Sequence, residues 1–255
     1  MVVSCIMNKT VLVTGSSNGI GKSIIKKFAS YGYNVVINYK TDLKSAEELK
    51  KYVEKTYNVQ TLIVKCDISK TNEVDKMVKD IINCFGTIDV LVNNASIEIN
   101  SDFFDKTEES FSETFNVNVI GTFLVTKYVS KEMLKNKTGS IINVASNNAI
   151  DKSDPVTLEY DASKAAIISL TKNFAIEFAP YIRVNAIAPG WVKTEKIKKL
   201  DKELNGNFIK EESKKCLLND FATEEDIANL VWFLSSDESR FINKEIIRID
   251  GGMYD

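Results

Sequence analysis

The residues with the clearest capacity for chemistry are Tyr160 and Lys164, which stand four positions apart in Tyr160-Asp161-Ala162-Ser163-Lys164. On a helix, that spacing places both side chains on one face. A nearby ammonium favours the phenolate and lowers the pKa of a tyrosine from about 10. The chain has no histidine, so a Ser-His-Asp triad, a Cys-His pair and a histidine-ligated metal site are all excluded. Tyr160 is therefore the candidate general acid or base, and no metal site is expected.

Ser146 follows a short apolar run, where its hydroxyl could hydrogen-bond a substrate carbonyl. Each of these features also has a simpler interpretation. A Tyr-x-x-x-Lys pair occurs on many helix surfaces, and a serine at this place can cap the end of a strand.

A glycine-rich turn lies near the start of the chain, between the apolar run 10–13 and an amphipathic stretch. Glycines let the backbone turn tightly and approach a ligand, and the start of the following helix favours a pyrophosphate. The alternative is an ordinary strand-to-helix turn, but the position in a first βαβ unit favours nucleotide binding. The predicted cofactor contacts in this turn are Gly15, Ser17, Asn18, Gly19, Ile20 and Gly21.

The end of the second predicted strand bears on the choice of nucleotide. An acidic side chain there would bind the adenosine ribose and repel a 2′-phosphate. The chain has instead Tyr39 and Lys40, with no acid before Asp42. NADP(H) is therefore favoured and NAD(H) stays possible, because Lys40 can also be one more solvated lysine.

Two later strands also end in polar residues, and ligands lie outside the carboxyl ends of strands in sheets of this kind. Asp67 and Ile68 are predicted to border an adenine. Asn94, Ala95 and Ser96 are predicted to border a ribose.

These residues require a scaffold, and the chain supplies short apolar runs that alternate with longer amphipathic ones. Runs without polar alternation are typical of parallel strands that are buried on both faces. The pattern predicts an α/β fold: one Rossmann-type doubly wound sheet of about seven strands, with helices on both faces. No Pro/Gly/Ser-rich linker interrupts the 255 residues, so a single domain over 1–255 is expected. A long helix is predicted over 108–135 and another over 160–179.

With these motifs in order, the chain resembles the short-chain dehydrogenase/reductases over essentially its whole length. Ser96 stands where the family's Asn-Asn-Ala-Gly signature has glycine. The matching segments are Thr14 to Gly21, Asn93 to Ser96, Asn118 to Gly121, Ser146 with Tyr160 and Lys164, Pro189 to Thr194, and Asp250 to Gly252.

The resemblance implies an oxidoreductase that transfers a hydride between a nicotinamide and a carbonyl or secondary alcohol. Tyr160 would move the proton and Ser146 would hold the substrate oxygen. Lys164 would bind the nicotinamide ribose and lower the pKa of Tyr160, and Asn118 would help hold a water connected to Lys164. Pro189, Gly190, Val192 and Thr194 would meet the nicotinamide, and residues 191–215 would form a lid over the substrate.

Among subfamilies, the chain is most similar to 3-oxoacyl-[acyl-carrier-protein] reductases and glucose-dehydrogenase-like enzymes. The substrate is therefore expected to be a small or carrier-bound carbonyl compound. A sugar, polyol or other small-alcohol dehydrogenase, or a non-catalytic nucleotide-binding regulator, stays open. The resemblance also implies a homotetramer, in which two long helices pack against their symmetry copies. Their small and apolar residues would allow close approach or could equally belong to the core, such as Ala165, Ala166, Ile168 and Ala175.

Composition limits the partners. The net charge is −2, so nucleic acid is not an expected partner. No apolar run approaches the roughly 20 residues that span a bilayer, and segment 1–7 is too short for a signal peptide. A soluble cytoplasmic protein is expected, with Cys66 and Cys84 as buried small hydrophobes.

Overall fold

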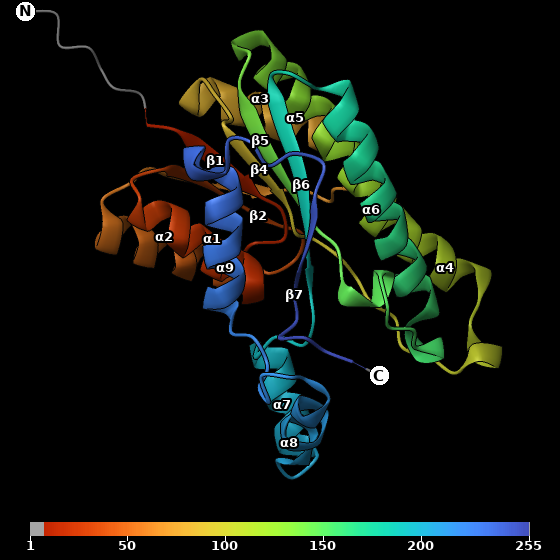
Figure 1. The fold of residues 1–255 in the computed structure, drawn as a ribbon. Helices are drawn as coiled ribbons and strands as arrows, with labels where there is room; N and C mark the ends of the chain where they lie inside the picture. The colour runs from red at the N-terminus through yellow and green to blue at the C-terminus, as the bar shows by residue number, and fades with distance from the viewer. Residues whose placement is uncertain (1–7, 255) are drawn as a thin grey trace, which may run out of the picture.

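The computed structural model describes residues 8–254, so segment 1–7, considered above as a signal peptide, lies outside the described residues. Within 8–254, no helix combines the length and apolar character needed to cross a membrane. The centre of the molecule is a seven-stranded sheet in which every neighbouring pair is parallel (Figure 1). The order of the strands is β3-β2-β1-β4-β5-β6-β7. The predicted doubly wound α/β fold is confirmed.

The central strands are buried on both faces, as their unbroken apolar sequences predict. In β1, Val11 and Val13 pack into the core on one face and Leu12 into the core on the other. Because side chains alternate along a strand, one short run contributes to both cores. The strands are β1 (Thr10–Val13), β2 (Asn34–Tyr39), β3 (Thr61–Lys65), β4 (Val90–Asn93), β5 (Gly139–Val144), β6 (Ile182–Pro189) and β7 (Ile246–Ile249).

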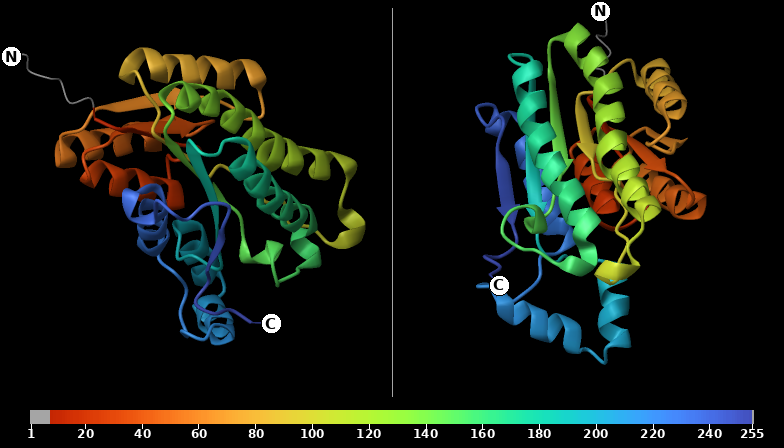
Figure 2. Two further views of the ribbon diagram at one scale, coloured as in Figure 1. Left: turned by 45° about the horizontal axis from the view of Figure 1, so that its top comes forward. Right: turned by 90° about the vertical axis from the view of Figure 1, so that its right-hand side faces the viewer.

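Helices cover both faces of the sheet, as Figures 1 and 2 show. One core lies under α1, α2 and α9, and the other lies under α3, α5 and the C-terminal part of α6. The helices are α1 (Gly19–Ser30), α2 (Leu43–Tyr57), α3 (Thr71–Phe85), α4 (Glu108–Phe115), α5 (Thr122–Asn136), α6 (Leu158–Glu177), α7 (Glu195–Glu203), α8 (Asn207–Glu212) and α9 (Glu224–Ser235).

Two expectations need correction. The helix predicted over 108–135 is divided into α4 and α5 by a wider π-helical turn, Asn116–Gly121, of a kind that is frequent at functional sites. Cys84 is exposed, because it lies on the solvent side of α3, whereas Cys66 is buried as expected.

The predicted lid, residues 191–215, leaves the sheet after β6 and contains α7 and α8. Both helices lie beyond the carboxyl end of the strands, away from the layers that cover the sheet (Figure 1). Gly206 separates them with a φ of 75°, a conformation that glycine adopts without strain. The segment therefore stands over the edge of the sheet where ligands bind in such folds.

Candidate active site

Three of the four predicted catalytic side chains line one cavity of about 290 Å³ at the carboxyl edge of the sheet: Ser146, Tyr160 and Lys164. Ser146 follows β5, and the other two lie on the first two turns of α6. The Nζ of Lys164 lies 5.4 Å from the centre of the Tyr160 ring, as the spacing of four predicts. The topology therefore brings a hydroxyl, a phenol and an amine from two distant segments together.

The electrostatics of this pair differ from the sequence-based expectation. Lys164 is 3% exposed and its Nζ donates to the carbonyl of Val144 at 2.7 Å. Burial lowers the pKa of Lys164 to about 8. The pKa of Tyr160 is raised rather than lowered, first by burial and then by the charge of Glu98, while a hydrogen bond with Ser146 opposes the rise. Desolvation is the largest cause of both shifts in pKa.

Asn118 lies in the π-helical turn, is 1% exposed and is not among the residues that line the cavity. Its side-chain carbonyl accepts from the Ile97 N–H at 2.9 Å, and its amide donates to the Ile97 carbonyl and to Ser163 Oγ, each at 2.9 Å. Ser163 Oγ in turn donates to the Tyr160 carbonyl at 2.7 Å. Asn118 thereby joins the segment after β4 to the catalytic turn of α6.

A second cleft, of about 370 Å³, runs along the ends of β1, β2, β3 and β4. It brings together the turn after β1 and three later loops, and it shares Ile20, Asn94, Ser96 and Thr194 with the cavity of Tyr160. The predicted cofactor residues that line it are Gly15, Ser17, Asn18, Gly19, Ile20, Gly21, Tyr39, Lys40, Asp67, Ile68, Asn94, Ala95, Ser96 and Thr194.

The glycines of the turn are required by close contacts. A Cβ on Gly15 would lie 2.9 Å from Cα of Ala95, and Gly15 has a φ of +60°. A Cβ on Gly21 would lie 2.7 Å from Nδ2 of Asn94. The backbone can therefore form a shallow cradle at the start of α1, which fits the pyrophosphate of a dinucleotide.

Asn38 is a residue of this cleft to which the sequence reading assigned no role. Its Oδ1 accepts from the Gly15 N–H at 2.9 Å, and its Nδ2 donates to the Cys66 carbonyl at 3.1 Å. A buried polar residue inside an otherwise apolar strand was the available signal. Asn38 holds the glycine turn and the loop after β3 in a fixed relation.

Lys40 and Asp67, predicted separately, form one ion pair with Nζ and Oδ2 2.9 Å apart. The hydrogen bond to Asp67 raises the pKa of Lys40. The candidate phosphate ligand therefore remains cationic, but a carboxylate balances its charge.

The remaining predicted nicotinamide contacts, Pro189, Gly190 and Val192, line the cavity of Tyr160 together with Thr194. Thr194 also caps α7, since its Oγ1 accepts from the Ile197 N–H at 3.4 Å. The end of β6 and the start of the lid are therefore part of one wall.

Other residues of that cavity were not named individually as site residues. Those of the lid belong to the segment 191–215 that was predicted to cover the substrate, and the others come from the loops after β4 and β5, which meet only in the fold. Together they include Glu98, Asn100, Asn147, Asn148, Lys152, Asp154, Thr157, Trp191, Lys196, Ile197 and Leu200.

The lysines of the lid are mostly paired with neighbouring acids. Lys198 contacts Glu195 at 2.8 Å and Lys214 contacts Glu211 at 2.6 Å, each pair three positions apart on exposed surface. These pairs lie on a solvated helical face, and exposed pairs of this kind contribute little to stability.

Comparison with known proteins agrees with this geometry. Residues 15–254 match the family model described as enoyl-(acyl carrier protein) reductase. The chain is 36% identical over 249 residues to the 3-oxoacyl-[acyl-carrier-protein] reductase FabG of Staphylococcus epidermidis, covering 97% of this chain and 100% of that protein. It is 35% identical over 257 residues to a diacetyl reductase [(S)-acetoin forming] of the same species, covering 97% and 99%.

Solved structures give the same result. ElxO with NADP bound superposes with a TM-score of 0.89 at 31% identity, covering 96% of this chain and 98% of that one. An NAD+-bound xylitol dehydrogenase superposes with a TM-score of 0.89 at 29% identity, covering 97% and 100%. From its fold, its site and these relatives, the chain belongs to the short-chain dehydrogenase/reductase family and is an oxidoreductase.

Proposed function

We propose that this protein is an NADP(H)-dependent oxidoreductase that interconverts a carbonyl compound and a secondary alcohol. The observation that supports this most strongly is the cavity shared by Ser146, Tyr160 and Lys164, which is continuous with the glycine-lined cleft. A non-catalytic nucleotide-binding regulator would have no need for all three groups in one cavity.

Each side chain has a distinct role in this proposal. The Ser146 hydroxyl binds the substrate oxygen, and the Tyr160 hydroxyl gives a proton in reduction or takes one in oxidation. Lys164 binds the ribose hydroxyls next to the nicotinamide and, when charged, stabilises the phenolate. Asn118 positions α6 and helps hold a water that links Lys164 to solvent. The nicotinamide supplies or accepts the hydride when it is bound.

The preference for NADP(H) is proposed from Lys40, whose ammonium stands at the end of β2 where a 2′-phosphate would be bound. The relatives support either nucleotide, since one neighbour carries NADP and another carries NAD+. Asp67 is expected to moderate the preference, because it already pairs with Lys40.

A 3-oxoacyl thioester on acyl carrier protein is the leading substrate, supported by the names of several relatives, which are 3-oxoacyl-[acyl-carrier-protein] reductases. A small polar carbonyl or polyol is the second candidate. It is favoured by the polar wall of the cavity, made by Asn148, Lys152, Asp154 and Thr157, and by the names of a diacetyl reductase and a xylitol dehydrogenase among the relatives.

Fluorescence titration with NADPH and with NADH, followed by addition of an acetoacetyl thioester, tests the proposal. We expect NADPH to bind more tightly and to be oxidised when the thioester is added. Tighter binding of NADH would overturn the role of Lys40. Binding without oxidation of any member of a broad carbonyl panel would favour the regulator.

We also propose a cytoplasmic homotetramer that is assembled through α4, α5 and α6. Ala165 is exposed and Ala166 is half-buried, so both can meet a second copy, but Ala175 lies in the core and is withdrawn from the predicted interface. Light scattering that shows a stable monomer at assay concentration would contradict the assembly.

A further inference from the structure

The substrate cavity contains a carboxylate that the proposed chemistry does not use. Glu98 lies two residues after Ser96, in the segment that follows β4, and its side chain is 29% exposed. It lines the cavity together with Ser146, Tyr160 and Lys164. A charged group at this place faces whatever binds beside the reacting carbonyl.

The oxygens of Glu98 are poorly satisfied by the protein. Among residues 8–254 its one cation within 4.0 Å is Lys196 on α7, whose Nζ is 4.0 Å away, and that lysine side chain is 76% exposed. No hydrogen bond joins the carboxylate to another described residue. For comparison, the ion pair of Lys193 and Asp220 is close, with Nζ and Oδ1 2.5 Å apart. The carboxylate therefore keeps acceptor capacity for a ligand.

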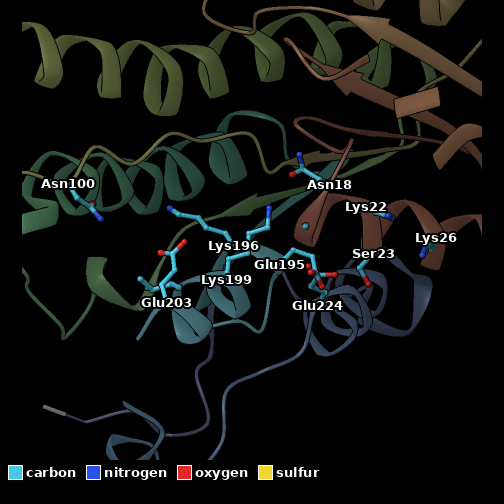
Figure 3. Close-up of a pocket in the computed structure, with 12 residues that line it drawn as sticks. Asn18, Lys22, Ser23, Lys26, Asn100, Glu195, Lys196, Lys199, Glu203 and Glu224 are labelled. Carbon is cyan, nitrogen blue, oxygen red and sulfur yellow. The ribbon is translucent and has the colours of Figure 1, made fainter. Parts of the chain in front are cut away.

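Lys196 has room to leave Glu98. It lies between the cavity and a larger groove of about 860 Å³, which runs from α7 to the start of α1 (Figure 3). Lys196 and Lys199 project into that groove from α7 and Lys22 and Lys26 line its other side, while Glu195, Glu203 and Glu224 balance their charge. An exposed, long and loosely paired lysine is easily displaced from the carboxylate by a ligand.

A carboxylate here works against the reaction unless it has a partner. The charge of Glu98 contributes, after burial, to raising the pKa of Tyr160, and it raises the pKa of Lys164 against the effect of burial. A negative charge near the phenol disfavours the phenolate. A neutral side chain would avoid this effect, so the presence of the carboxylate is explained best if the substrate supplies a hydrogen-bond donor to it.

The rest of the cavity agrees with such a substrate. The lid contributes an apolar side, with Trp191, Ile197 and Leu200, and Asn148 and Thr157 lie on a polar side. Asn148 Nδ2 is occupied by the Asp161 carboxylate at 2.9 Å, and Thr157 Oγ1 bonds to the same carboxylate at 3.0 Å. Asn148 and Thr157 thus share the Asp161 carboxylate as their acceptor, and neither is hydrogen-bonded to Glu98.

We propose that Glu98 determines substrate specificity: its carboxylate accepts a hydrogen bond from a hydroxyl or ammonium group carried near the reacting carbonyl. The inference rests on the proposed oxidoreductase function and narrows its substrate class to carbonyl compounds with such a donor. It does not depend on which nucleotide is used.

Isosteric ketones test the proposal with the full-length protein and NADPH. Hydroxyacetone, aminoacetone and butanone have the same chain length and differ in one terminal group, and 4-hydroxy-2-butanone against 2-pentanone repeats the comparison one carbon further out. We expect kcat/KM to be at least about 10-fold higher for the better donor-bearing ketone than for its alkyl isostere, since hydrogen bonds to charged groups are among the stronger ones.

Two variants distinguish the donors. Glu98→Gln retains a hydrogen-bond acceptor but loses the negative charge. We expect the kcat/KM ratio of hydroxyacetone to butanone to fall only in part, and the ratio of aminoacetone to butanone to fall by about 30-fold. Glu98→Leu is expected to abolish both preferences, so that the donor-bearing ketones lose their advantage in kcat/KM over their alkyl isosteres. Glu203→Gln, the same change at a carboxylate of α7 that lines the groove but not the cavity, is the matched control and should leave every ratio unchanged.

An unchanged ratio of donor-bearing to alkyl ketones in Glu98→Leu would overturn the proposal, even if the enzyme is fully active. Failure of the oxidoreductase function gives a different result, namely bound cofactor with no turnover of any ketone. In that case calorimetry with hydroxyacetone and with aminoacetone, in the presence of NADP, compares the unmodified protein with Glu98→Leu. Equal or absent binding in both proteins would reject the role of Glu98.

Discussion

The glycine-lined cleft and the cavity of Tyr160 share an edge of the sheet but are built differently. In the cleft, polar side chains bind the protein's own backbone: Asn94 donates to the carbonyls of Thr14 and Gly15, and Thr14 Oγ1 accepts from the Asn94 N–H at 3.0 Å. In the cavity, the Glu98 carboxylate lines the wall without a hydrogen bond to another described residue. Lys164 is buried and its pKa is lowered. The cleft is a satisfied, rigid cradle, and the cavity holds groups whose partners are incomplete.

Under the proposed function, this difference separates nucleotide binding from proton transfer. A cradle whose donors and acceptors are paired holds the same shape with any substrate. Groups that are desolvated and only partly paired have shifted pKa values, as proton-transferring groups at active sites often do. Changes in the cavity should therefore affect turnover and pH dependence, and changes in the cleft should affect nucleotide affinity.

The largest expected effect comes from Tyr160→Phe, which removes the proton donor. We expect kcat/KM to fall by about 10³-fold, within the range for loss of a general acid or base, with unchanged affinity for NADPH. Initial rates and fluorescence titration measure the two quantities. Tyr181→Phe, at an exposed tyrosine, is the control. Near-normal activity of Tyr160→Phe would remove this residue from the mechanism. It would also contradict the view that the cavity carries the proton-transferring group.

The next effect is a pH dependence of stability that comes from Lys164. Its pKa is lowered to about 8 in the folded state against 10.5 for the ordinary lysine, so between these values the unfolded state binds more protons. Stability from this group therefore rises with pH. Relative to Lys164→Met, the unmodified protein should gain about 2 kcal/mol of unfolding free energy between pH 7.5 and 9.5.

Urea denaturation at the two pH values measures this gain. Lys40→Met is the matched variant from the cleft, because the pKa of Lys40 is raised by its hydrogen bond to Asp67. Its proton is retained by both states over this range, so no comparable gain is expected. A similar pH dependence of stability for the two variants would contradict the contrast between a lysine with a lowered pKa in the cavity and one with a raised pKa in the cleft.

The cleft itself is tested by Gly15→Ala. The new Cβ would meet Ala95 Cα at 2.9 Å, and we expect the affinity for NADPH to fall by about 10-fold as the cradle is displaced. Gly32→Ala is the control, since Gly32 also has a positive φ (+81°) but no atom within 4 Å of a Cβ. Both variants should lose stability, and only Gly15→Ala should lose affinity. Equal affinity in the two variants would contradict a rigid cradle.

The smallest effect concerns the choice of nucleotide. Lys40→Ala should reduce the ratio of NADPH to NADH affinity by about 5-fold, since exposed charge pairs contribute modestly. Asp67→Asn should raise the ratio by about 3-fold, because it releases the Lys40 ammonium from its carboxylate partner. Titration with both nucleotides checks the two changes, and a ratio that is insensitive to either would assign the preference elsewhere.

Much of the cleft could be predicted because its parts are local. The turn after β1, the end of β2 and the pair Asn94 and Ala95 each follow an apolar strand directly, and parallel strands place their carboxyl ends at one edge. Tyr160 and Lys164 were predicted for the same reason, since one helical turn relates them. The helix interruption at 116–121 was missed because its weak helix formers, Asn116, Asn118 and Gly121, are also tolerated inside continuous helices and do not specify a wider turn.

By itself, the sequence determined the parallel sheet, the family and the residues available for proton transfer, because the absence of histidine and the spacing of short motifs are properties of the chain alone. The tertiary structure decided which charges meet. It joined Lys40 to Asp67, buried Lys164 so that its pKa falls, and placed Glu98 in the cavity of Tyr160. Burial and distance between remote segments set these energies, and neither quantity is encoded in local spacing.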